Sequence, residues 1–201
     1  MIITMPEFST ADLLSKISYI QNTIDPELKL VLNPEWNSKN TNHRLAIRRC
    51  MEEKFTAHFS REQLAWLNDL NWLPEARNGY FSISHSSRMG GFSYSQFVHG
   101  FDIEETRRIS HEIIKRTSTE DEVKQALRLE FLWVAKEAGF KALSDSDPAL
   151  VISDLICFDW HSHIENQVFS FRLKSQKTLD FGLNKGFIFS EGVCLFAIFL
   201  K

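Results

Sequence analysis

The stretch from Gly79 to Glu105, GYFSISHSSRMGGFSYSQFVHGFDIEE, decides the fold class of this chain. Apolar and small polar residues alternate in three short runs, and a Gly-Gly pair separates the first two runs. Alternation over a few residues is the pattern of a half-buried strand. We therefore predict three strands here, the last of which presents Asp102 and Glu104 on one face.

Helical spacing dominates the sequence before this stretch. Ser9 and Asp12 have the spacing of a capping box and open a first predicted helix. A second predicted helix carries Arg44 and Arg48 on its exposed side, and a third begins at the capping box of Ser60. The first quarter of the chain is therefore predicted to be helical.

The sequence after this stretch repeats the change of pattern. Helical spacing predicts a short helix at about 110–117 and a long one from Thr119 through Ala138. Strand patterns then return at 150–159, 167–174 and 187–199. The order helices, strands, helices, strands indicates an α+β fold with two similar halves, 1–98 and 99–201.

The composition describes a folded chain of ordinary charge. Its 201 residues are 43% hydrophobic, and 23 Lys and Arg stand against 26 Asp and Glu. These values exclude a disordered chain and argue against a nucleic-acid partner. Three cysteines without motif spacing are expected to be buried thiols. Because neither a secretory signal nor a membrane-spanning segment is recognised, a cytoplasmic protein without membrane contact is the simplest expectation.

Three clusters of reactive side chains stand out, and each has a bland explanation when taken alone. Asp102 and Glu104 share a strand face, where like charges repel unless a cation separates them, but D-x-E is also common on solvated strands. Glu137 and Lys141 lie one helical turn apart, which is also the spacing of a surface ion pair. His85 ends a strand among phosphate-binding residue types, and a hydrogen-bonded structural histidine is the competing interpretation.

The order and spacing of the three clusters resemble the 4'-phosphopantetheinyl transferase superfamily. SISHS is followed by HGFDIEE and then by LWVAKEAGFK, and the likeness covers residues 41–143 by motif. It is most similar to the larger, pseudo-dimeric (surfactin-synthetase-activating) type, which modifies carrier domains of fatty-acid, polyketide and nonribosomal-peptide synthases. The resemblance implies two pseudo-symmetric α+β halves, each a small antiparallel sheet packed with helices. It also implies Mg²⁺-dependent transfer of the 4'-phosphopantetheine arm of coenzyme A to a carrier-protein serine, with release of adenosine 3',5'-bisphosphate.

The resemblance assigns the acidic residues position by position. Asp102, Glu104 and Glu137 match carboxylates that hold Mg²⁺ on the coenzyme A pyrophosphate, and hard cations prefer such oxygen ligands. Glu137 is in addition the candidate general base for the incoming serine hydroxyl. One further acidic residue is expected at the start of the long helix predicted from Thr119. Glu122 is the choice on the better spacing, and Glu120 is the alternative.

The resemblance also assigns the basic side of the site. Lys141 matches a lysine that contacts phosphate, a task that suits a flexible point charge. Ser84 and His85 match residues on the 3'-phosphate side of the nucleotide, and Arg44 resembles a basic helix residue near the same phosphate. Lys141 is thus expected to serve both in coenzyme A binding and in catalysis.

The expected partner is an acyl or peptidyl carrier protein of acidic character. Basic residues after the DIE motif are candidates for docking it, although a solvated helix face explains them equally simply; they are Arg107, Arg108, Lys115 and Arg116. A monomer is expected because two halves already supply the cleft that a shorter homologue forms between subunits.

Departures from the family pattern leave alternatives open. The usual G-K-P segment is replaced by Leu73-Pro74-Glu75-Ala76, which puts one phosphate or adenine contact in doubt. The alternative function is a catalytically silent module of the same fold that binds coenzyme A or a carrier protein. His161 and His163 lack a third ligand of zinc-site spacing, so an exposed turn is the expectation there.

Overall fold

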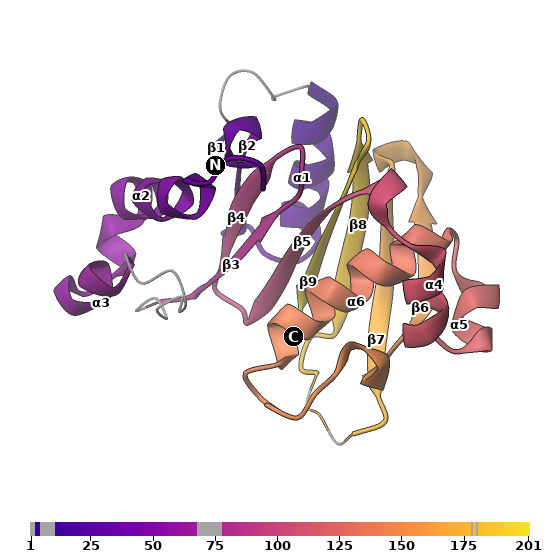
Figure 1. The fold of residues 1–201 in the computed structure, drawn as a ribbon. Coiled ribbons are helices and arrows are strands. Elements are labelled where there is room, and N and C mark those ends of the chain that lie inside the picture. The colour runs from indigo at the N-terminus through magenta and orange to yellow at the C-terminus, as the bar shows by residue number, and fades with distance from the viewer. Residues whose placement is uncertain (1–2, 5–10, 68–77, 178, 180) are drawn as a thin grey trace.

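The computed structural model describes the chain apart from residues 1–2, 5–10, 68–77, 178 and 180, and it contains two β-sheets (Figure 1). The first sheet has the strand order β1 (Ile3–Thr4), β2 (Lys29–Asn33), β4 (Gly90–Ser95), β3 (Tyr80–His85). The second has the order β5 (His99–Glu105), β9 (Cys194–Leu200), β8 (Lys185–Glu191), β7 (Val168–Ser175), β6 (Leu155–His163). Only the short β1 is parallel to its neighbour in these described sheets. The α+β class is confirmed.

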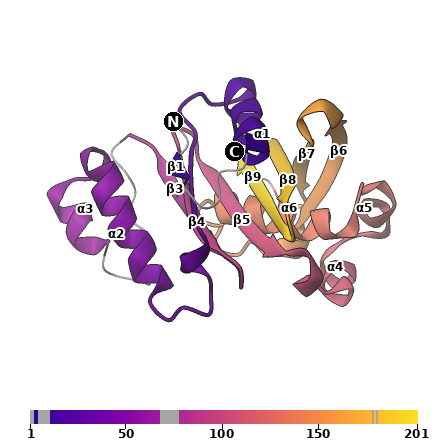
Figure 2. The ribbon, with the colours of Figure 1, turned by 90° about the horizontal axis from the view of Figure 1, so that it is seen from above.

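Helices lie on both sides of the sheets. In chain order they are α1 (Ala11–Thr23), α2 (His43–Phe55), α3 (Arg61–Trp66), α4 (His111–Thr117), α5 (Glu120–Gln125) and α6 (Leu129–Leu143). Figure 2 shows α2 and α3 on one side of the molecule and α4 and α5 on the other. The first sheet buries Phe81, Phe92 and Val31 against α2, whereas the second sheet buries Leu173 and Phe199 against α6.

A third core lies between these two. Leu13, Ile17 and Ile20 of α1 pack with Phe187 and Phe189 of β8, although α1 comes from the first half of the chain. The strands divide cleanly between the sheets near residue 98, but this helix crosses that division. The two-half organisation therefore stays a prediction, and so does its pseudo-symmetry.

Two predicted elements are each divided in the structure. The long helix predicted from Thr119 is broken at 126–128, where Ala126 and Arg128 have extended backbone, so that α5 and α6 are separate. The strand predicted at 187–199 is a hairpin, because Glu191 pairs with Cys194 across a two-residue turn. Gly192 opens that turn with φ +57°, a backbone conformation that glycine adopts without steric cost.

The prediction of an all-helical first quarter is wrong at β2. Leu30 and Leu32 face the core under α1, and Val31 faces the core under α2. Because both faces of β2 are buried, its sequence KLVLN lacks the alternation that reveals a half-exposed strand. Ser9 and the segment 73–76 lie outside the described residues.

Other sequence expectations concern the cysteines, the histidine pair and the membrane. All three cysteines are free and buried, as predicted. His161 and His163 lie on β6 rather than in a turn; His161 contacts Asp159, and His163 contacts Ser170. Among the helices of the described residues, none combines the length and apolar character needed to cross a bilayer.

Candidate active site

The two sheets meet where the edge strands β3 and β5 lie side by side. The Ser82 hydroxyl oxygen accepts the Phe101 backbone N–H at 2.9 Å, and the Ser84 hydroxyl oxygen accepts that of Ile103 at 3.0 Å. Serine side chains thus take the place of backbone carbonyls in joining the two edges. Because Ser82 and Ser84 are two residues apart on β3, both point toward the same neighbour.

Helix α6 packs closely on β5 because residue 100 is glycine. A Cβ at Gly100 would lie 1.9 Å from the carbonyl oxygen of Ala138 and 2.8 Å from the amide nitrogen of Ala142. A side chain of any size at this position would push the helix away. The close approach brings Lys141 of α6 into contact with Asp102 of β5.

Asp102 contacts side chains of both β3 and α6. Its Oδ1 accepts a hydrogen bond from the Ser84 hydroxyl at 2.9 Å and an ion-paired hydrogen bond from Lys141 Nζ at 2.7 Å. Lys141 also donates to Ser84 Oγ and to the Phe101 carbonyl. The surface pair considered between Glu137 and Lys141 is replaced by this contact across 39 positions of sequence.

The charge of Asp102 affects the pKa of the other two predicted carboxylates, Glu104 and Glu137. Burial raises the pKa of Glu104, and repulsion from Asp102 raises it further. Burial likewise raises the pKa of Glu137 to about 7, with added repulsion from Asp102 and Glu104 that Lys141 partly offsets. These three carboxylates from β5 and α6 therefore form one electrostatic group, as expected from side chains that share a strand face and meet a helix.

The donor set fits a hard divalent cation in its chemistry. All three side chains offer oxygen ligands, and Asp102 Oδ2 is buried without a hydrogen-bond partner among the described residues. A cation would satisfy that oxygen and relieve the mutual repulsion. As the side chains stand, however, no group of three or more His, Cys, Asp or Glu in the described part of the chain is arranged to hold a metal ion. Binding would require them to converge.

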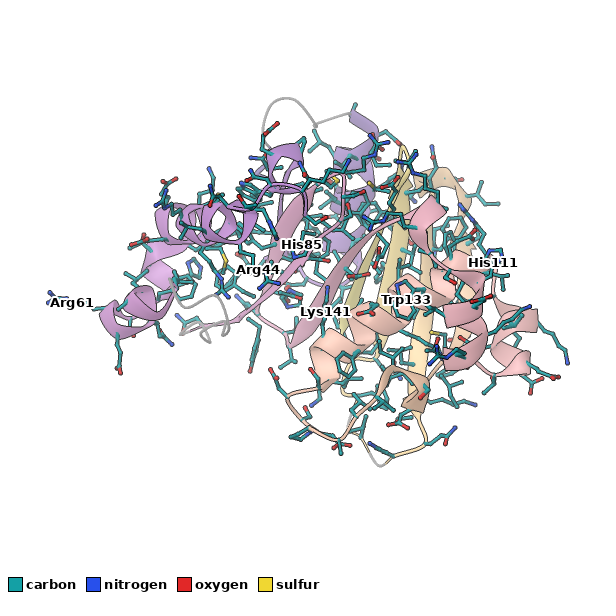
Figure 3. The ribbon with its side chains drawn as sticks, in the orientation of Figure 1. Arg44, Arg61, His85, His111, Trp133 and Lys141 are labelled. Carbon is teal, nitrogen blue, oxygen red and sulfur yellow. The ribbon has the colours of Figure 1, made fainter. Side chains whose placement is uncertain are left out.

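The basic side of the junction comes from α2, β3 and α6. The His85 ring meets the His43 ring edge-on, with centroids 4.3 Å apart. Burial lowers the pKa of His85, and the charges of His43, Arg44 and Lys141 lower it further. Figure 3 shows the labelled His85, Arg44 and Lys141 close to one another in the middle of the view. Arg44 is exposed, as predicted, whereas Arg48 is buried and the prediction of an exposed pair is wrong there.

A pocket of about 350 Å³ opens beside this junction. It brings together two of the predicted site residues, His85 and Glu104, but Arg44, Asp102, Glu137 and Lys141 do not form its walls. Its complete lining is Ser38, His85, Ser86, Ser87, Glu104, Arg108, Ile109, Ser110, Ile113 and Trp133. Of the three carboxylates, Glu104 is therefore the one that lines the pocket.

Glu122 and Glu120, the candidates for a further acidic ligand, have other contacts in the structure. Glu122 is buried, forms a 2.8 Å ion pair with Lys136 and accepts the Cys157 backbone N–H. It also completes the capping box of Thr119 at the start of α5. Glu120 is exposed and lies 3.8 Å from Lys124. The oxygens of Glu122 join α5 to α6 and β6, and its role as a further ligand stays a prediction.

Two residues of this region were missed by the sequence interpretation. Trp133 is not among the predicted site residues, but its indole N–H donates to Glu104 at 3.3 Å and the residue lines the pocket. Its position one helical turn before Glu137 could have revealed it. Glu105, the last residue of DIEE, is fully buried and accepts a hydrogen bond from the Ser87 hydroxyl.

Comparisons with known proteins leave the family open. No protein-family model matches the sequence, and no curated protein is significantly similar to it.

Proposed function

We propose that this chain is a 4'-phosphopantetheinyl transferase that moves the phosphopantetheine arm of coenzyme A onto a carrier-protein serine. The observation that carries the proposal is the junction of β3, β5 and α6, where Ser84, Asp102 and Lys141 are in direct contact. These residues come from the three motifs that resemble the family, and 57 positions separate the first from the last. We further propose that the two sheets belong to pseudo-symmetric halves and that coenzyme A binds at their junction.

The proposed chemistry is largely positional and electrostatic. When bound to Asp102, Glu104 and Glu137, Mg²⁺ would neutralise charge on the pyrophosphate. The serine oxygen attacks the β-phosphorus in line, the bond from that phosphorus to the bridging oxygen breaks, and adenosine 3',5'-bisphosphate leaves with the electron pair. Glu137 takes the serine proton as the general base.

In this proposal the basic residues bind the phosphates of coenzyme A. Lys141 is the cation nearest the carboxylates, and a flexible ammonium can pass from Asp102 to a phosphate oxygen. His85 and the exposed Arg44 stand on the other side of the junction, where they would meet the 3'-phosphate. The phosphates of coenzyme A would thus lie between α2 and α6.

One contact favours a second candidate, the catalytically silent module that binds coenzyme A or a carrier protein. Lys141 Nζ lies 2.7 Å from Asp102 Oδ1, so the lysine already offsets part of the negative charge that a metal ion would neutralise. In such a module the ammonium would stay on Asp102 and coenzyme A would bind without turnover.

Intact-protein mass spectrometry separates the two candidates. Apo acyl carrier protein is incubated with the chain, coenzyme A and Mg²⁺, and the expected result is a metal-dependent gain of one phosphopantetheine. Asp102→Ala and Glu137→Gln should abolish the gain, whereas Asp159→Ala on β6, away from the junction, should leave it unchanged. Coenzyme A binding without any gain on several unrelated carriers would reject the transferase in favour of the silent module.

A further inference from the structure

A second pocket, of about 510 Å³, lies on the far side of Ile109 from the first. Ile109 belongs to the walls of both pockets, so the two are neighbouring parts of one surface. The lining of the second pocket is Thr106, Arg107, Ile109, His111, Arg128, Glu130, Ser190, Gly192, Val193 and Leu195. We call this second pocket the hairpin groove, because the turn between β8 and β9 forms one of its walls.

The hairpin groove presents positive charge to the solvent. The Arg107 and Arg128 side chains are 68% and 46% exposed, whereas their ion-pair partners Glu105 and Glu130 are only 0% and 22% exposed. The acids thus lie beneath the arginines. Arg107 and Arg128 each form their ion pair through Nε, and each guanidinium has four N–H donors besides the one on Nε. An anionic partner would meet these donors before it met either acid.

The groove also has an exposed apolar side chain in a fixed place. Val193, at the hairpin turn, is 50% exposed. Its carbonyl oxygen accepts both the backbone N–H of Thr106, at 3.0 Å, and the Thr106 hydroxyl, at 3.1 Å. The turn is therefore tied to the segment that carries Arg107, and the groove is formed before any partner binds.

We propose that the hairpin groove docks an acidic segment of the carrier protein, with one apolar side chain of that segment packed on Val193. This inference rests on the proposed function for the identity of the partner. The groove adjoins the pocket that contains Glu104, so a carrier held there has its serine within reach of the carboxylates. Arg107 and Arg128 supply the charge. Lys115 and Arg116, exposed on α4, lie outside the walls of both pockets and have no part in this docking.

The test measures binding without chemistry. The affinity of immobilised apo acyl carrier protein for the chain is measured by interferometry, without coenzyme A or metal, at low and moderate salt. Arg128→Glu should weaken binding by about tenfold at low salt and flatten the salt dependence, and Val193→Asp should weaken it to a similar extent. Arg172→Glu, an exposed arginine of β7, is the matched control and should change binding less than about twofold.

The outcomes keep the docking and the transfer apart. Wild-type binding that neither groove variant weakens overturns the docking, even where mass spectrometry shows transfer. Absence of measurable wild-type binding also overturns it. Binding that both groove variants weaken and the control does not supports the groove, and it does so even where no phosphopantetheine is transferred. Since Val193→Asp lies in a turn outside α6, it remains informative if Arg128→Glu disturbs the start of that helix.

Discussion

Acid should destabilise this protein through one buried histidine, His99 at the start of β5. Its Nδ1 contacts the Phe97 carbonyl at 3.1 Å and its Nε2 contacts the Ser93 hydroxyl at 2.7 Å. A carbonyl only accepts, so Nδ1 carries the proton, and Nε2 accepts from the serine. Complete burial lowers the pKa of His99 from 6.5 to about 4, a shift that its hydrogen bonds and the charge of Asp25 only partly oppose.

The magnitude follows from the difference between the folded and unfolded pKa. Below pH 6.5 the unfolded chain takes up a proton on this residue that the folded chain refuses until about pH 4. Stability is therefore complete above pH 6.5 and is lost as the pH falls toward the folded value. A shift of about 2.5 units at about 1.4 kcal/mol each gives a loss of about 3 kcal/mol, most of it reached by about pH 4.5.

Urea denaturation at a series of pH values between about 7 and 4.5 measures this loss. Other acid-sensitive groups act on wild type and variant alike, so the comparison with His99→Gln isolates the contribution of His99. The variant should start less stable and lose about 2 kcal/mol less than wild type over that range. Phe187→Leu is the control, because it removes core volume without a titratable group and should give a curve parallel to wild type. Equal pH slopes for wild type and His99→Gln would refute the reasoning.

Three further predictions concern packing, a buried charge and the thiols. Gly100→Ala should cost about 1–3 kcal/mol in urea denaturation and reduce any transfer activity, because its Cβ collides with the α6 backbone; an unchanged midpoint would contradict the close packing. Lys136→Met should cost about 3–5 kcal/mol by leaving Glu122 buried and unpaired, and adding Glu122→Gln should recover much of that loss. A thiol reagent in excess should react slowly with native protein and promptly with three thiols in denaturant, because burial raises the pKa of Cys50, Cys157 and Cys194.

The sequence predicts best the elements whose two faces differ in polarity. Alternation in GYFSISHS and the capping box of Ser60 correspond to β3 and to the start of α3. It fails at β2, where both faces are buried, and at the β8–β9 hairpin, where a buried run hides a turn at Gly192. Local periodicity detects a contrast between an apolar and a polar face, and these segments offer little of that contrast.

For the candidate site, too, the sequence predicts some features and not others. Shared strand and helix faces predict that Asp102 and Glu104 act together and that α6 supplies the facing residues. Periodicity cannot predict the contact of Lys141 with Asp102, because that contact depends on how closely α6 approaches β5 at Gly100. Periodicity also cannot predict the contact of Glu122 with Lys136, because Lys136 becomes its neighbour only when the chain breaks between α5 and α6.

The packing of α1 on the second sheet has a consequence for the order in which the protein is made. Leu13 and Ile17 leave the ribosome long before the Phe187 and Phe189 side chains that pack on them. Until β8 has emerged, the nascent chain therefore carries α1 with part of its apolar face uncovered. Ribosome-bound chains halted before residue 185 should be cut by protease within α1, and chains whose β8 and β9 are carried clear of the exit tunnel by an added linker should be protected there. Helix α1 is thus made early and covered late.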